Sequence, residues 1–244
     1  MVKTERRQLR FGDQSLDLLV KRSARRKRRL SLSLNAQGKP LLQVPMSVSN
    51  AEIEAMVKNH LDWLIKKQQE FDEHCQEHPP IHFVDGEQVE FLGRELTLAV
   101  DAAPGRGQVL LQNDCLAIKV PSYSPQKISA QLQRWYRLQA QQIFMERLVF
   151  WSSQISWVSA VPPLRIRRMR SRWGSCSSDG RICLNSELIR LDPQYLDYVI
   201  AHELCHLQEF NHSKRFYALM DSVMPDWSVR KKALAKVNLR RLLM

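Results

Sequence analysis

The segment "AHELCHLQEFNHSKRF", residues 201–216, constrains the fold of this chain more than any other. The sequence before it predicts a helix, because Asp192 can cap the first turn and Pro193 suits the first helical position. His202 and His206 stand four residues apart on that helix, so they project from one face, a turn apart. Both imidazoles can then reach one ion, and the segment predicts a helix that presents a metal site.

Two further residues of the segment complete a catalytic set. Glu203 follows the first histidine, and a glutamate in that position is not a ligand but takes the proton of the attacking water. A catalytic zinc site normally has three protein ligands and one water, so a third ligand is needed. The helix is expected to run to about Phe210 and cannot itself deliver His212. Asn211 tolerates a left-handed conformation and could turn the chain so that His212 meets the ion.

The metal expected at His202, His206 and His212 is Zn²⁺, which lowers the pKa of a bound water to about 7. Histidine-rich sites also accept nickel, cobalt and copper, so Ni²⁺ and other divalent transition metals stay open. A structural zinc site without catalysis is the alternative, but a closed site uses four protein ligands. The segment offers three histidines and a base.

The charge of the chain favours anionic partners. Its 244 residues carry 37 basic and 25 acidic side chains, a net charge of +12, which suits nucleic acid, nucleotides, acidic peptides or a membrane surface. The densest basic run, Lys21 to Arg29, is either a phosphate-contacting patch or a solvated strand edge. No Gly-rich phosphate loop of the P-loop kind is present.

Several features favour the cytoplasm. The start, "MVKTERRQLRF", has no apolar signal region, and no window approaches the roughly 18 apolar residues of a membrane-spanning helix. The five cysteines are odd in number and suggest no disulfide framework, which indicates a reducing compartment.

The periodicity of the chain predicts two domains. Residues 1–122 read as a β-rich domain with one helix, which begins in a capping box of Ser49 and Glu52 and runs to about Phe71. Two hairpins follow, the first turning at 92–94. A long helix over 124–153 opens the second domain, residues 123–244, in which a strand and a hairpin precede three helices.

The hairpin "RSRWGSC" lies just before the metal helix and is the candidate for substrate binding. Its edge strand could pair with an extended substrate. Arg170 and Arg172 could bind an oxyanion, a phosphate or a substrate carboxylate, with Trp173, Gly174 and Ser175 beside them. Alternatively, Trp173 is a core residue, Gly174 permits a tight backbone approach and the arginines are solvated.

The sequence resembles the YgjP-like metallopeptidase family, a relative of the SprT-like zincins. The resemblance rests on "RSRWGSCSSDGRICLNSELIRL" followed by "LDYVIAHELCHLQEFNHSKRFYALMDSVMPDW", and on "RRKRRLSLSL", "FLGRE" and "QRWYRLQAQ". It implies that His202, His206 and His212 bind zinc and that Glu203 is the general base. The expected fold is α+β: an N-terminal β-rich region with one helix, then a zincin-like helical domain with a small sheet.

Three functions fit these observations. The first is a cytoplasmic zinc-dependent hydrolase of the HExxH type, most simply a metallopeptidase acting on a peptide substrate. The second is a metal-dependent nucleotide pyrophosphatase, because hydrolysis of a nucleoside triphosphate also needs activated water and positive charge. The third is a zincin associated with nucleic acid, which the net charge permits.

Overall fold

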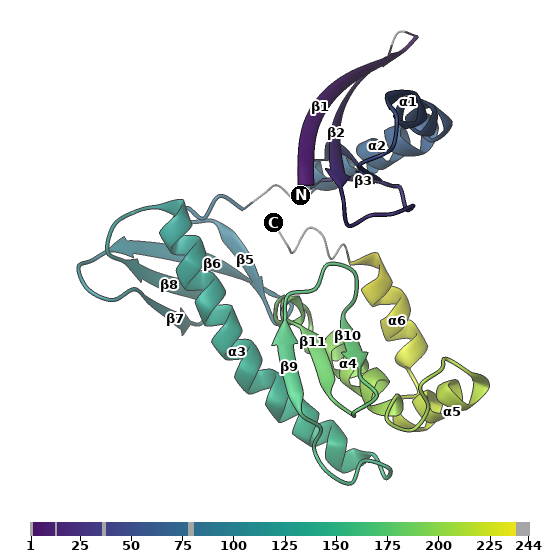
Figure 1. Ribbon diagram of the computed structural model, residues 1–244. Coiled ribbons are helices and arrows are strands. Elements are labelled where there is room, and N and C mark those ends of the chain that lie inside the picture. Colours follow the sequence, from purple (N-terminus) through teal and green to yellow (C-terminus); the bar gives the residue numbers. More distant parts are fainter. Residues whose placement is uncertain (1, 13, 36–37, 78–80, 238–244) are drawn as a thin grey trace. The chain divides into compact units, whose positions relative to one another are not determined.

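The computed structural model describes residues 2–12, 14–35, 38–77 and 81–237. Its contacts divide the chain into two compact units, Met1–Pro80 and Ile81–Met244 (Figure 1). Each unit has its own hydrophobic core.

The first unit is a four-stranded sheet with two helices. The strands are β1 (Val2–Phe11), β2 (Gln14–Ser23), β3 (Ser31–Leu34) and β4 (Pro40–Pro45), in the order β1-β2-β4-β3. Alternate strand residues such as Leu18, Val20 and Leu42 are buried, and they form one core with Ile53 and Val57 of the first helix.

The single helix expected over residues 49–71 is two helices, α1 (Asn50–Asn59) and α2 (Leu61–Glu77). The capping box is confirmed, since Ser49 and Glu52 hydrogen-bond reciprocally at the start of α1. The break follows from His60, whose φ of −120° and ψ of 17° lie outside the helical range.

The basic run Lys21 to Arg29 is partly structural. Arg22 is buried, where it donates hydrogen bonds to the Val48 carbonyl and the Asn50 side chain and pairs with Glu5 at 3.2 Å. Its guanidinium therefore holds β2 to the start of α1. The next residues of the run, from Ala24 to Arg29, are mostly exposed.

The second unit begins with a four-stranded sheet covered by one long helix. Strands β5 (Gln88–Phe91), β6 (Arg94–Ala102), β7 (Gln108–Gln112) and β8 (Cys115–Val120) have the order β5-β6-β8-β7. Both predicted hairpins are confirmed, and the first turns through Leu92 and Gly93, which both have positive φ. Helix α3 (Pro125–Gln154) follows, as expected, and buries an apolar stripe that includes Leu132 and Phe144.

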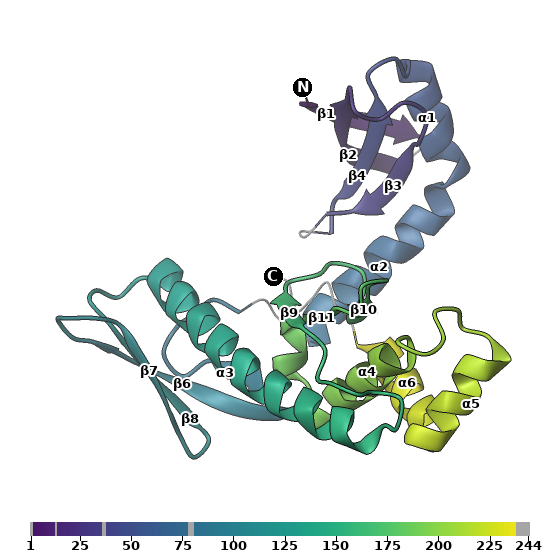
Figure 2. The same ribbon diagram turned by 60° about the horizontal axis from the view of Figure 1, so that its bottom comes forward.

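The rest of the unit is a three-stranded sheet and a group of helices. Strands β9 (Leu164–Arg167), β10 (Gly174–Cys176) and β11 (Ile182–Asn185) have the order β10-β11-β9, so β10 and β9 are its two edges. A short 3₁₀ helix η1 (Ser186–Arg190) precedes α4 (Pro193–Cys205), α5 (Lys214–Val223) and α6 (Trp227–Lys236). Helix α3 lies between the two sheets of this unit (Figures 1 and 2).

The division of the chain at residue 80 differs from the boundary expected near residue 122. The turn of the β5–β6 hairpin is the reason, because it docks on the later part of the chain. Leu92 N–H donates to the Ile189 carbonyl at 2.9 Å, and Gly93 N–H donates to the Arg190 carbonyl at 3.0 Å. Gly93 also lies against Asp192, whose Cα would be 2.9 Å from an added Cβ. The second sheet and the helices therefore share one core, from Val89 to Leu234.

The α+β fold class is confirmed, with small sheets and helices in both units. Among the described residues, no helix is both long enough and apolar enough to cross a membrane.

Candidate metal centre

Three imidazoles converge at the end of α4. His202 lies in the last turn of the helix and His206 is its C-cap, still with helical φ and ψ. Nε2 of His202 lies 3.2 Å from Nε2 of His206 and 3.1 Å from Nε2 of His212. The three residues offer nitrogens that all lie within 4.8 Å of one another. The structure thus brings together the three histidines that the spacing singled out.

The turn that returns His212 differs from the expected one. Helix α4 ends at Cys205 rather than near Phe210, and a hydrogen-bonded turn follows, in which Glu209 N–H donates to the Cys205 carbonyl at 3.0 Å. Asn211 is not among the residues with positive φ, so no left-handed residue is used there. The reversal is completed by Ser213, whose side chain accepts from Phe216 N–H and begins α5.

A backbone carbonyl sets the tautomer of His206. Its Nδ1 lies 3.0 Å from the carbonyl oxygen of Glu209. A carbonyl can only accept, so Nδ1 carries the proton and the lone pair of Nε2 faces the other two histidines. A metal-binding histidine usually donates its other ring N–H in a hydrogen bond of this kind. This contact could not be predicted from the sequence, because a backbone acceptor depends on the path of the chain and not on a residue type.

Phe216 forms the wall behind the cluster. This fully buried ring of α5 lies 4.9, 4.6 and 4.8 Å, centroid to centroid, from the rings of His202, His206 and His212. Its helical periodicity predicts only a core residue. The structure adds that the same ring fixes the positions of all three imidazoles.

The environment disfavours the charged forms of His202 and His206. Burial, and then the charges of His206, His212 and Lys231, lower the pKa of His202 to about 3. Burial and His212 also lower the pKa of His206, against the opposing effect of the Glu209 carbonyl. Neutral imidazoles are metal ligands, whereas imidazolium is not.

Two of the three nitrogen–nitrogen spacings are near those of a tetrahedral ion. With metal–nitrogen bonds of about 2.0–2.1 Å, two ligands of a tetrahedral zinc ion stand about 3.3–3.4 Å apart. The two spacings from His202, 3.2 and 3.1 Å, are close to this value. The three-histidine donor set therefore suits zinc or another divalent transition metal.

Glu203 is buried between α4 and the edge strand β10. Only 4% of its surface is exposed. Burial raises the pKa of its carboxyl to about 8, against the lowering effects of a hydrogen bond from Cys176 N–H and the charge of Arg172. Gly174 makes the contact possible, because a Cβ there would lie 2.5 Å from Glu203 Oε1 and 2.7 Å from Val199 Cγ1. The tight backbone approach at Gly174 was one of the two sequence interpretations.

The hairpin residues expected to bind substrate surround this strand. Arg170 and Arg172 are exposed in the loop before β10, and Trp173 is half-buried against the core. Ser175 lies within β10, opposite Cys183. The structure thus places these residues at or next to the edge strand beside Glu203, which is compatible with both interpretations of the hairpin.

Asn185 holds the loop before β10 in place, a role that its residue type did not reveal. It is fully buried, and its amide donates to the carbonyls of Met169 at 3.0 Å and Arg172 at 2.9 Å. Its side-chain oxygen accepts from Met169 N–H and Glu187 N–H. One side chain therefore ties this loop to β11 and to the start of η1.

Comparisons with known proteins place the chain in a described family. The family model described as "YgjP-like, metallopeptidase domain" matches residues 28–237. Two solved structures are similar to part of the chain: the metallopeptidase zymogens abylysin of Pyrococcus abyssi and jannalysin of Methanocaldococcus jannaschii. Each is 20% identical with a TM-score of 0.32, and the matches cover 38% and 39% of this chain and 90% and 93% of theirs. No curated protein matches the sequence.

Proposed function

The chain belongs to the YgjP-like metallopeptidase family, and from that premise we propose that it hydrolyses peptide bonds with a zinc ion held by His202, His206 and His212. Membership of the family makes it a metal-dependent hydrolase of the peptidase type. The observation that carries the assignment of these ligands is the convergence of the three imidazoles, with 3.1 and 3.2 Å between their Nε2 atoms.

When bound, zinc supplies a Lewis acid for the substrate carbonyl and lowers the pKa of a water molecule to about 7. The ligand nitrogens of the three histidines are preorganised for the ion. The Glu209 carbonyl fixes His206, and all three rings pack on Phe216.

Glu203 is the proposed general base. Its carboxylate takes one proton from the water whose oxygen attacks the carbonyl carbon. The carboxylic acid then gives that proton to the nitrogen of the leaving amine as the carbon–nitrogen bond breaks. Burial suits the transfer, because a carboxylate that is only 4% exposed keeps the proton away from bulk water until the amine leaves.

Strand β10 is the proposed binding edge for the peptide. It is an edge of its sheet and it lies against Glu203 through Gly174. An extended peptide could continue the sheet there by main-chain hydrogen bonds. In this proposal Arg170 and Arg172 contribute positive charge beside the peptide, which favours acidic side chains near the cleaved bond.

The decisive experiment compares wild type with Glu203→Gln on casein and on nucleoside triphosphates. Wild type should cleave casein, and Glu203→Gln should bind metal normally but lose at least about 100-fold in rate, because the amide cannot accept the proton. Glu146→Gln is the control, an exposed glutamate of α3 outside the metal centre, and should keep its rate. Cleavage of casein by Glu203→Gln at the wild-type rate would refute the mechanism. Hydrolysis of triphosphates instead of casein would favour the pyrophosphatase.

The metal and the compartment belong to the same proposal. Zinc is proposed over nickel on the three-histidine donor set, and elemental analysis of protein purified without added metal tests this choice.

A cytoplasmic location is proposed because the four cysteines that the structure describes, Cys115, Cys176, Cys183 and Cys205, are free thiols.

A further inference from the structure

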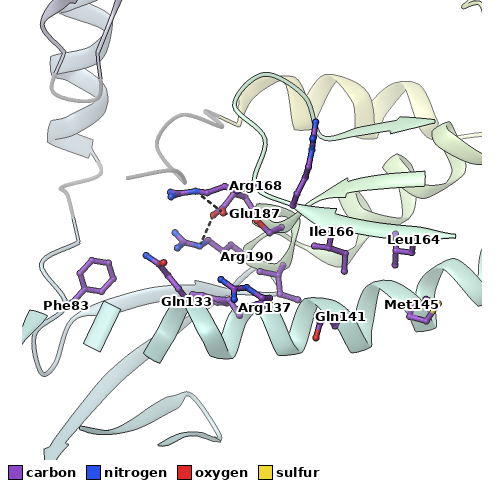
Figure 3. Close-up of a pocket in the computed structure, with 14 residues that line it drawn as sticks. Phe83, Gln133, Arg137, Gln141, Met145, Leu164, Ile166, Arg168, Glu187 and Arg190 are labelled. Atoms are coloured by element: carbon purple, nitrogen blue, oxygen red, sulfur yellow. Dashed lines mark hydrogen bonds and ion pairs between the residues drawn. The ribbon is translucent and has the colours of Figure 1, made fainter. Parts of the chain in front are cut away.

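A cavity lies at the edge of the three-stranded sheet that is opposite β10. Its volume is about 390 Å³, within the range of small-molecule sites, and α3, β9 and η1 line it (Figure 3). The histidine cluster and Glu203 are not part of its wall. Because β9 and β10 are opposite edges of the sheet, this cavity is separate from the proposed metal centre.

One end of the cavity is charged. Arg168 and Arg190 both face the carboxylate of Glu187, at 3.5 and 3.4 Å, and Arg137 approaches from α3 (Figure 3). We call these four side chains the arginine end. Its three positive charges and one negative charge leave a net charge of +2, and Arg167 adds a further positive charge to the lining. The carboxylate therefore does not neutralise the arginine end.

The guanidiniums of the arginine end keep most of their hydrogen-bonding capacity. Each offers five N–H donors. In the part of the chain that the structure describes, the side chains of Arg137, Arg168 and Arg190 donate no hydrogen bond, and Glu187 meets two of them only at ion-pair distances. Guanidiniums that line one cavity and still have free N–H donors form a preformed site for an oxyanion.

The deepest guanidinium is held rigidly. The side chain of Arg190 is 12% exposed, and its Cζ lies 5.0 Å from the centroid of the Tyr136 ring. Tyr136 is fixed in turn, because its O–H donates to the Glu90 carbonyl at 2.6 Å. Arg168 is 48% exposed and stands at the entrance. A ligand can thus enter past Arg168 and reach Arg190, whose guanidinium is already held in position. This preorganisation reduces the entropy lost on binding.

The other end of the cavity is apolar. Ile166 and Leu164 of β9 lie across from Met145 of α3 (Figure 3). These side chains cannot bind an anion, but they can cover a hydrocarbon body that extends from a charged head group. The cavity is therefore matched to an amphipathic molecule.

We propose that this cavity binds an organic phosphate monoester, with the phosphate at the arginine end and its organic body along Ile166 and Leu164. A phosphate monoester carries about −1.5 to −2 charges at pH 7 and three acceptor oxygens. That charge balances the net charge of the arginine end, whereas a carboxylate leaves it positive. Three oxygens can also accept from several guanidiniums at once.

The test is calorimetric titration of the full-length protein with phenyl phosphate. One equivalent should bind, Arg137→Gln should weaken binding at least about tenfold, and Arg134→Gln should leave it unchanged. Arg134 is the matched control, an exposed arginine of the same helix that does not line the cavity. Inorganic phosphate and phenylacetate should both bind more weakly, since each lacks one half of the ligand. Binding should survive removal of metal with a chelator.

The proposal fails if phenyl phosphate does not bind, if Arg134→Gln weakens binding as much as Arg137→Gln, or if chelation abolishes it. Phenylacetate that binds as tightly as phenyl phosphate would overturn the phosphate class. Equal binding of inorganic phosphate would overturn the role of the apolar end. Competition then identifies the source of the ligand: displacement by a phosphotyrosine peptide indicates a phosphorylated side chain, and displacement by a nucleoside monophosphate alone indicates a free metabolite.

Discussion

Gly174 lies so close to Glu203 that a methyl group on its Cα would stand 2.5 Å from Oε1 of the carboxylate. The same methyl group would also meet Cγ1 of Val199 at 2.7 Å. The φ of Gly174 is not positive, so the glycine is required for space and not for backbone conformation. The side chain of Glu203, the proposed general base, thus packs directly against the backbone of β10.

Replacing Gly174 with alanine should therefore disable hydrolysis without removing the metal. Either Glu203 or β10 must move by roughly an ångström, and a displacement of that size costs on the order of 100-fold in rate. The three histidines lie at the end of α4 and in the turn before α5, and none of them is among the atoms nearest to the added methyl group, so they should bind metal as before. The measurement is the rate of peptide hydrolysis beside the metal content of the same preparation.

Gly180→Ala is the control for this variant. Gly180 turns the same hairpin with a φ of +76°, and its nearest contact for a Cβ is Leu207 Cδ2 at 3.6 Å. Alanine there should cost about 1 kcal/mol of stability through backbone strain but leave the rate unchanged. Equal loss of rate in both variants would show that hairpin strain, and not the contact with Glu203, governs activity.

Those features of the site that depend only on the spacing of residues along a helix could be predicted from the sequence. A four-residue interval on a helix determines that His202 and His206 share a face, so their convergence could be predicted from the sequence alone. The route of His212 could not, because the turn relies on backbone hydrogen bonds to Cys205 and on the cap at Ser213. The Glu209 carbonyl was missed for the same reason.

The domain boundary depends on contacts that no local pattern encodes. The turn at Leu92 and Gly93 was predicted, but its hydrogen bonds to Ile189 and Arg190 join residues about one hundred positions apart. Strand β1 was also missed, since most of its residues are charged or polar and only Leu9 is buried. Its pairing with β2 therefore leaves little hydrophobic signal.

Phe216→Leu should weaken metal binding more than it weakens the fold. Leucine keeps most of the buried volume, so the expected loss of stability is about 1 kcal/mol. It cannot contact three imidazoles as the ring does, and looser ligands should lower metal affinity about tenfold, as loss of supporting contacts does in other sites. Competition with a chelating dye measures the affinity.

Met220→Leu is the matched control, because Met220 is fully buried in the same helix and one turn away. Met220→Leu should lose no more stability than Phe216→Leu and should keep the metal affinity of the wild type. If both variants bind metal as wild type does, Phe216 is only a core residue.

Asp197→Asn should destabilise the second unit. Arg147 Nε donates to Asp197 Oδ1 at 2.7 Å and a second guanidinium nitrogen donates to Oδ2 at 2.6 Å, which ties α3 to α4. The carboxylate is 12% exposed and the arginine 35%, so solvent screens part of the interaction. We expect a loss of about 1–2 kcal/mol, measured by urea unfolding.

The exposed pair Arg230 and Asp226 provides the comparison, with side chains 22% and 55% exposed. Asp226→Asn should change stability by less than about 0.5 kcal/mol. A loss at Asp226 as large as that at Asp197 would contradict the view that burial of the bidentate pair determines its contribution.

Cys176 should react slowly with alkylating reagents in the folded protein, and the rate should rise steeply with pH. Burial, and then the negative charges of Glu203 and Asp179, raise the pKa of its thiol to about 11. The thiolate is the nucleophile, so at pH 8 its fraction is about 100-fold lower than for an unperturbed thiol; because a more basic thiolate is also more nucleophilic, the net reduction in rate is about tenfold. Iodoacetamide labelling followed by peptide mass spectrometry, between pH 7 and pH 10, measures it, with urea-unfolded protein as the reference. The folded rate should keep increasing beyond pH 9, where the unfolded rate levels off. A folded rate that levels off together with the unfolded one would mean that neither burial nor the two carboxylates raise the pKa of this thiol.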